Sequence, residues 1–198
     1  MKKVLAWVLC LMLTLGMVSV ASAEFAPVNK DDLKVGFVFI GDVSDKGYPY
    51  AHYQGLLDMQ QNLGLSDDQI LIKTNVSEDS SCETALRELV EAGCQIIFGN
   101  SYGYMNYMAE LADEYPEVIF SHCSGYMSND TNFNNYFGAI YQARYLAGIA
   151  AGLKTQTNKI GFVAAMQTPE VIGGFSAFSG MFHVLPVRNA PFTRPFAQ

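Results

Sequence analysis

Short apolar runs alternate with amphipathic stretches along the first two thirds of the chain. Apolar runs of strand length occupy four segments, at residues 33–40, 69–73, 95–98 and 118–121. Between them, apolar residues recur at helical spacing in three segments, at residues 50–63, 82–92 and 105–114. Strands that are apolar throughout are typical of parallel sheets covered on both sides. The alternation therefore predicts an α/β fold in which a parallel sheet carries helices on both faces.

A second alternation begins after this region and stops early. The pattern predicts a strand at 136–141, a helix rich in small residues at 144–153, a strand at 159–164 and a helix that Pro169 opens. This order is typical of the start of a second lobe. Residues 181–198 contain three prolines and have neither helical nor strand periodicity. We therefore expect the sequence to contain only the first elements of a second lobe.

The first 23 residues have the features of a secretory signal peptide. Lys2 and Lys3 precede an uncharged apolar run from Val4 to Val20, and residues 21–23 supply a small-x-small cleavage pattern. The alternative is an uncleaved anchor, since the run approaches the roughly 17–20 residues of a short membrane span. The predicted organisation is a signal peptide at 1–23, an N-terminal α/β lobe at 24–140, a crossover and start of a second lobe at 141–178, and an irregular tail at 179–198.

The chain is acidic, with a net charge of −7 over its 198 residues. Removal of Lys2 and Lys3 with the leader makes it more negative still. Because an acidic protein repels phosphate backbones, nucleic acid is excluded as an expected partner. The cysteines and histidines lack paired metal-ligand spacing, and no glycine-rich phosphate-binding motif follows a strand. We expect neither a metal nor a cofactor.

Polar and aromatic residues gather directly after three of the predicted strands. In parallel α/β sheets, ligands bind beyond the carboxyl ends of the strands. The loop after the first strand offers a carboxylate and tyrosines, a combination that suits a flat, nitrogen-rich ligand. The loops after the third and fourth strands offer hydroxyls, small residues and more tyrosines. The candidate residues in these three loops are Asp45 and Tyr48, then Ser101 and Tyr102, then Ser124, Gly125 and Tyr126.

A catalytic alternative rests on Ser101. Residues 99–103 match the Gly-x-Ser-x-Gly spacing of a hydrolase nucleophile, which makes a secreted serine hydrolase the alternative function. A hydrolase also needs an acid and a histidine later in the chain. His122 follows too soon for the usual order, and His183 lies in the irregular tail. The expected protein is a binding protein and not an enzyme.

Several dispersed motifs, in the same order, resemble those of one protein family. The motifs are Asp45–Gly55, Ser101–Tyr104, Tyr115–Pro116, His122–Gly125, Ala143–Gly148, Lys159–Val163 and Pro169–Val171. Between about Lys34 and Phe178, the chain resembles the basic membrane protein (BMP) family of ABC-transporter substrate-binding proteins. The resemblance implies a periplasmic-binding-protein type I fold whose two lobes close around a small ligand.

The resemblance also implies a ligand, partners and residue roles. The better-known ligands of the family are purine nucleosides and nucleobases. By position, Tyr48 would stack on the base and Asp45 would accept hydrogen bonds from it. Ser101, Tyr102, Ser124, Gly125 and Tyr126 would line the same lobe, and Glu170 would lie where the second lobe meets the cleft. The implied partner is an ABC permease, and the implied location is periplasmic or at the cell surface, in association with the plasma membrane.

The tail departs from the family pattern near Ser179. The family continues there into a complete second lobe, so a frameshift or truncation is the hypothesis for residues 179–198. A single lobe would bury only one face of a ligand, and we therefore expect weak or absent ligand binding by this chain. A ligand-sensing surface module built on the same lobe remains a further alternative to transport.

Overall fold

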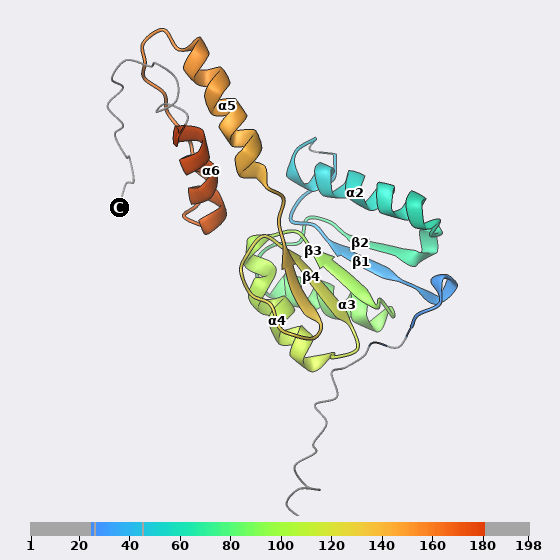
Figure 1. The fold of residues 1–198 in the computed structure, drawn as a ribbon. Helices are drawn as coiled ribbons and strands as arrows, with labels where there is room; N and C mark the ends of the chain where they lie inside the picture. The colour runs from blue at the N-terminus through green and yellow to red at the C-terminus, as the bar shows by residue number, and fades with distance from the viewer. Residues whose placement is uncertain (1–24, 26, 45, 181–198) are drawn as a thin grey trace, which may run out of the picture. The chain divides into compact units, whose positions relative to one another are not determined.

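A five-stranded sheet with strand order β2-β1-β3-β4-β5 organises the larger part of the molecule (Figure 1). The computed structural model describes residues 25, 27–44 and 46–180. The chain divides between Asn135 and Tyr136 into two compact units. The strands are β1 (Val35–Val38), β2 (Ile70–Lys73), β3 (Ile96–Gly99), β4 (Ile119–Cys123) and β5 (Phe133–Tyr136).

The helices fall close to the positions that the sequence pattern predicts. The α-helices are α2 (Tyr48–Leu63), α3 (Ser80–Glu91), α4 (Met105–Glu114), α5 (Ile140–Lys154) and α6 (Pro169–Gly180). Three short 3-10 helices are η1 (Lys30–Asp32), η2 (Asp67–Gln69) and η3 (Tyr102–Tyr104). The side chain of Asp79 caps α3 by accepting a hydrogen bond from the Ser81 backbone N–H at 2.9 Å. This cap explains why α3 begins two residues before the predicted start.

The sheet is parallel, as the sequence predicts. β1 pairs in parallel with both β2 and β3, and β3 pairs in parallel with β4. β5 lies beside β4 in the same direction, because Phe120 N donates to Asn132 O and the Ser121 hydroxyl donates to the side chain of Asn134. The expected α/β architecture is therefore confirmed.

Helices cover both faces of this sheet, with α2 on one face and α3 and α4 on the other (Figure 1). The alternation of side chains along β1 sets up the two layers. Val35 and Phe37 pack toward Leu56 of α2, whereas Val38 packs into the cluster formed with α3 and α4. Gly36 faces α3 so closely that an added Cβ would lie 3.0 Å from Leu89 Cδ1. A larger residue at this position would require the side chains of Leu89, Cys94 and Ile97 to shift.

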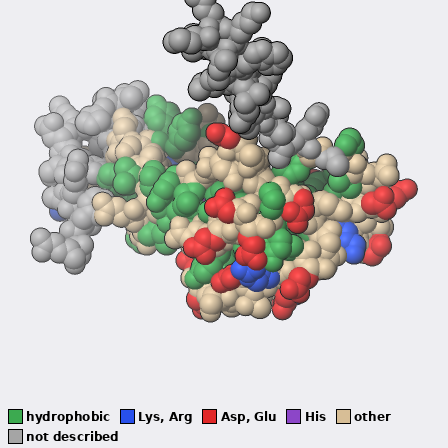
Figure 2. All heavy atoms as spheres, turned by 90° about the horizontal axis from the view of Figure 1, so that it is seen from below, with side chains coloured by type: hydrophobic (Ala, Val, Ile, Leu, Met, Phe, Trp, Pro, Cys, Tyr) green, Lys and Arg blue, Asp and Glu red, His purple; other side chains and the backbone are tan. Residues whose placement is uncertain are grey.

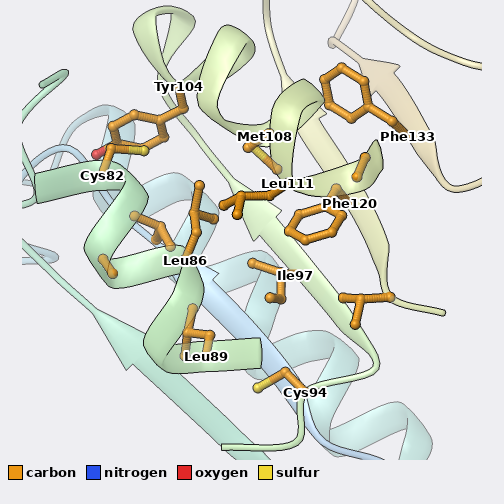
Figure 3. Close-up of a cluster of buried hydrophobic side chains, with 14 of the residues drawn as sticks. Cys82, Leu86, Leu89, Cys94, Ile97, Tyr104, Met108, Leu111, Phe120 and Phe133 are labelled. Atoms are coloured by element: carbon orange, nitrogen blue, oxygen red, sulfur yellow. The ribbon is translucent and has the colours of Figure 1, made fainter. Parts of the chain in front are cut away.

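The larger core cluster lies between the sheet and the helices α3 and α4 (Figure 3). Leu86 of α3 and Leu111 of α4 point toward one another above Ile97 of β3, and all three are buried. Two buried cysteine thiols, Cys82 and Cys94, contribute to the same cluster as small apolar groups. Acidic side chains are widespread and basic ones few on the face that Figure 2 shows, as the net charge of −7 leads one to expect.

The second unit is a helix pair whose members contact one another through small residues. Gly148 of α5 lies against the backbone carbonyl of Phe178 in α6, and an added Cβ would collide with it. The Arg144 guanidinium lies 5.6 Å from the centre of the Phe162 ring, which also packs against Phe175 and Phe178. α6 begins at Pro169, as predicted from the preference of proline for the first helical turn.

Two strand predictions after residue 135 are wrong. Residues 136–141 were expected to form a strand, but β5 ends at Tyr136 and α5 begins at Ile140. The apolar run at 159–164 forms no strand in the described part of the chain. Phe162 of this run packs onto the aromatic residues Phe175 and Phe178 of α6, and residues 137–180 of the second unit contain no strand with which the run could pair. The predicted signal peptide and most of the predicted tail lie outside the described residues.

Substitution of Leu86 by alanine should destabilise the larger unit strongly. Leu86 is fully buried between α3 and α4, so its truncation removes apolar burial and leaves a cavity. The expected loss is about 2–5 kcal/mol in the free energy of unfolding, measured by urea denaturation. Leu63→Ala at the end of α2 is the matched control, because Leu63 is 51% exposed. Equal losses for the two variants would contradict the core placed between α3 and α4.

Candidate functional site

Three strand ends meet at one edge of the sheet. Val38 of β1 is in register with Gly99 of β3, and Gly99 is in register with His122 of β4. The loops that follow these strands therefore start side by side at the carboxyl edge, which is where parallel α/β sheets bind ligands. The side chain of Asn100 ties the first two loops together by accepting a hydrogen bond from Ile40 N at 3.0 Å.

The loop after β1 leads to Tyr48, the first residue of α2. The Tyr48 hydroxyl donates to the Sγ of Cys123 at 3.5 Å, which joins this loop to the end of β4. Its ring meets the His52 ring edge-on at 4.6 Å between centroids, and the side chain is 42% exposed. Tyr48 thus presents an accessible aromatic surface at the sheet edge. Asp45, the carboxylate predicted to act beside it, lies outside the described residues.

The loop after β3 carries Ser101, which is buried, and Tyr102, which is half-buried. The Ser101 hydroxyl donates to Glu78 Oε1 at 2.6 Å, and the Gly103 backbone N–H donates to the same oxygen at 2.7 Å. Glu78 is not among the residues that the sequence pattern predicts for the site, because it follows no strand end of the three loops. No local motif marks it, since its partners lie more than 20 residues further along the chain.

The loop after β4 turns sharply at two consecutive residues. Ser124 and Gly125 have φ values of 73° and 72°, a left-handed conformation that glycine adopts freely and serine seldom does. Gly125 also packs so closely on the buried His122 ring that an added Cβ would lie 2.6 Å from its Cε1. Tyr126 follows with 69% of its side chain exposed. The turn therefore delivers Ser124 and Tyr126 to the same edge as Ser101.

His122 lies beneath these loops and connects two of them. Its Nε2 is 2.7 Å from the Ser101 backbone oxygen. A carbonyl can only accept, so Nε2 carries the proton and donates. Burial lowers the pKa of the His122 imidazole from its ordinary value, although contacts with the backbone of Ser101 and Ser124 oppose the shift. The ring is therefore neutral at physiological pH.

Within the described residues, the hydrogen-bond partners of Ser101 differ from those of a hydrolase nucleophile. The Ser101 hydroxyl pairs with a carboxylate, while His122 contacts the backbone oxygen of the same residue. Among the residues that the structure describes, the hydrogen-bond partner of the Ser101 hydroxyl is Glu78 and not a histidine. The Gly-x-Ser-x-Gly spacing at 99–103 falls where β3 ends and the 3-10 turn η3 follows.

Three further observations bear on the sequence predictions. Glu170 lies in the first turn of α6, which belongs to the second unit.

Across the described part of the chain, no three His, Cys, Asp or Glu side chains are grouped so that they could hold a metal ion. Among the helices of that same part, none combines the length and the apolar character needed to cross a membrane.

The buried position of His122 predicts an unusually acidic imidazolium. Titration of its ring protons by NMR should give a pKa below the ordinary value of about 6.5. The unfolded chain then binds the proton more tightly than the folded protein, so stability should fall as the pH drops below about 6.5. Loss of one signal in His122→Asn assigns the resonance, and the urea-unfolded protein is the reference. A His122 pKa at or above that of the unfolded protein would contradict this description.

Residues 32–181 match the family model of PnrA-like ABC transporter substrate-binding proteins. A purine-binding protein of Brucella abortus is 32% identical over 149 residues, which are 75% of this chain and 42% of that protein. A Haloferax volcanii protein, whose name assigns it glucose as a ligand, is 31% identical over 153 residues, 77% of this chain and 38% of its own length. The chain thus spans about two fifths of the length of these curated relatives.

The fold is also similar to a solved structure. The crystal structure of a transcriptional activator of the comK gene from Bacillus halodurans superposes with a TM-score of 0.56 at 27% identity. The similarity covers 75% of this chain and 50% of that one. The matched region includes the whole sheet and the three loops at its carboxyl edge, since the family model begins before β1 and ends after α6. The chain belongs to the PnrA-like, or BMP, family of ABC-transporter substrate-binding proteins.

Proposed function

We propose that this protein is the extracytoplasmic solute-binding component of an ABC transporter and that it binds a small purine-like ligand, a nucleoside or a nucleobase. The observation that carries the proposal is the convergence of three loops at one sheet edge, each with polar or aromatic side chains. Membership of a substrate-binding family agrees with it, and so does the purine-binding relative at 32% identity.

The chemistry of this edge suits a flat, nitrogen-rich ring. An exposed tyrosine ring offers a surface on which a flat aromatic ring can stack. Tyr48 has that role in the proposal, and Asp45 accepts hydrogen bonds from the base. Hydroxyls and backbone groups on the neighbouring loops contact the remaining edges of the ligand. These groups belong to Ser101, Tyr102, Ser124, Gly125 and Tyr126.

Transport then depends on closure of two lobes around the ligand. Glu170 contributes from the second lobe, and a membrane permease recognises the closed state that the ligand stabilises. The described part of the second unit supplies two helices and no strand. The contacts proposed here, Glu170 apart, come from the first unit, and contacts from one side of a ligand give weak binding. Residues 1–198 by themselves should therefore bind purines weakly and release them quickly.

Titration of the purified protein with adenosine, inosine and adenine, followed by NMR to millimolar concentrations, tests the proposal. Binding should be weaker than micromolar. Tyr48→Ala should weaken it on the order of 5- to 100-fold, as expected when about 1–3 kcal/mol of base stacking is lost. Tyr48→Phe is the matched control, because it keeps the ring and removes the hydroxyl group that contacts Cys123. Its affinity should stay close to that of the unchanged protein.

Glucose is the competing ligand in the same titration. Saturable binding of glucose together with no response to any purine would reject the purine assignment. No response to either class at millimolar concentration would reject the binding role of this chain. Submicromolar purine affinity would show that closure by a complete second lobe is not needed.

A ligand-sensing role is the second candidate, and the similarity to a transcriptional activator favours it. Transport and sensing predict different effects of deleting the gene. Deletion of the gene should lower the uptake of a radiolabelled purine if the protein serves transport. Unchanged uptake with altered gene expression would favour sensing instead.

A further inference from the structure

Glu78 is an acidic residue that reaches the site from outside the three loops. It lies in the segment between β2 and α3, and its Oε1 accepts hydrogen bonds from both the Ser101 hydroxyl and the Gly103 backbone N–H, at 2.6 and 2.7 Å. A carboxylate that accepts two such bonds holds its partners more firmly than a neutral acceptor does. One oxygen of Glu78 therefore fixes both sides of Tyr102.

The loop after β3 is shaped to lie directly on this carboxylate. A Cβ built on Gly103 would lie 2.6–2.8 Å from the side-chain carbons of Glu78, so any other residue there would displace one of the two. The buried Tyr104 side chain anchors the same loop nearby, since its hydroxyl donates to Val76 O at 2.5 Å. The segment before α3 and the loop after β3 are thus joined at three points.

The opposite side of Ser101 is held by a second group. The Ser101 backbone oxygen accepts from His122 Nε2 at 2.7 Å and from Tyr104 N at 3.1 Å. Its hydroxyl proton is meanwhile donated to Glu78, which leaves the oxygen only its lone pairs for any other partner. The backbone oxygen and the hydroxyl of Ser101 are therefore both held by hydrogen bonds. Towards a ligand, the hydroxyl oxygen can act only as a hydrogen-bond acceptor.

We propose that Glu78 is a positioning residue of the ligand site: it orders the Ser101–Gly103 loop before ligand arrives and makes the Ser101 oxygen an acceptor for a ligand N–H or O–H group. The inference rests on the proposed function of the edge. A loop ordered in advance loses less conformational entropy on binding, so the ordering raises affinity without contact between Glu78 and the ligand.

Two measurements on the whole protein test this proposal. In the first, amide hydrogen exchange of Gly103 is followed without ligand. Glu78→Ala should accelerate that exchange on the order of 10-fold or more, because the N–H loses its acceptor, and Glu78→Gln should give an intermediate rate. Exchange at the buried core amide of Leu86 should not change. Glu88→Gln is the matched control, since the Glu88 carboxylate bonds to Lys73 and not to this loop.

In the second measurement, purine affinity is compared in a double-mutant cycle. Glu78→Ala and Ser101→Ala should each weaken binding on the order of 5- to 30-fold, within the range of a lost charge-assisted hydrogen bond. When Glu78 is already alanine, adding Ser101→Ala should lower the purine affinity by a further factor of less than about 2, because the two residues act through one contact. If the loss of affinity in the double variant equals the product of the two single losses, Glu78 contacts the ligand independently, and the positioning role is overturned.

The exchange measurement separates this inference from the proposed function. Unchanged Gly103 exchange in Glu78→Ala overturns the inference even if purines bind. Accelerated exchange at Leu86 as well as Gly103 also overturns it, because Glu78 would then support the fold as a whole. Accelerated Gly103 exchange in a protein that binds no purine would show an ordered loop without a ligand role, and would reject the inference together with the proposed function.

Discussion

Parallel pairing of β1, β3 and β4 is the constraint on which the rest of the structure depends. Because these neighbouring strands run in one direction, their carboxyl ends lie at one edge, and residues 60 positions apart such as Ile40 and Asn100 become hydrogen-bonded neighbours. Parallel strands need crossover helices, and the crossovers place α2 on one face and α3 and α4 on the other. The core and the site therefore follow from one pairing pattern.

Three polar side chains, two buried and one exposed, tie the loops of the candidate site together. Asn100 links the ends of β1 and β3, His122 links β4 to the loop after β3, and Glu78 holds that loop from the segment before α3. Each of these groups satisfies a backbone group that leaves the regular sheet. The loops at the edge are thus ordered by bonds beneath and beside them, and their exposed tyrosines are left to face outward.

The sequence predicted the parts of the structure that periodicity controls. α4 has the predicted bounds, Met105–Glu114, and four of the strands overlap the predicted apolar runs. The run at 159–164 was equally apolar but forms no strand, because strand formation depends on a partner that the pattern does not reveal. For the site, the strand ends predict Tyr48, Ser101, Ser124 and Tyr126 as candidates, and the structure places them after strands that end at one edge of the sheet. Glu78 could not be found in this way, since its role comes from a long-range contact in the folded chain.

The central position of β1 has a consequence for the order in which the protein can form. β1 is the first strand to be synthesised, but it lies between β2 and β3 and cannot be completed until residues near Asn100 are available. At about 5–20 residues per second, the wait is on the order of 3–12 seconds. During that time β1 can pair with β2 but its other edge has no partner strand, and the nascent chain remains a substrate for chaperones.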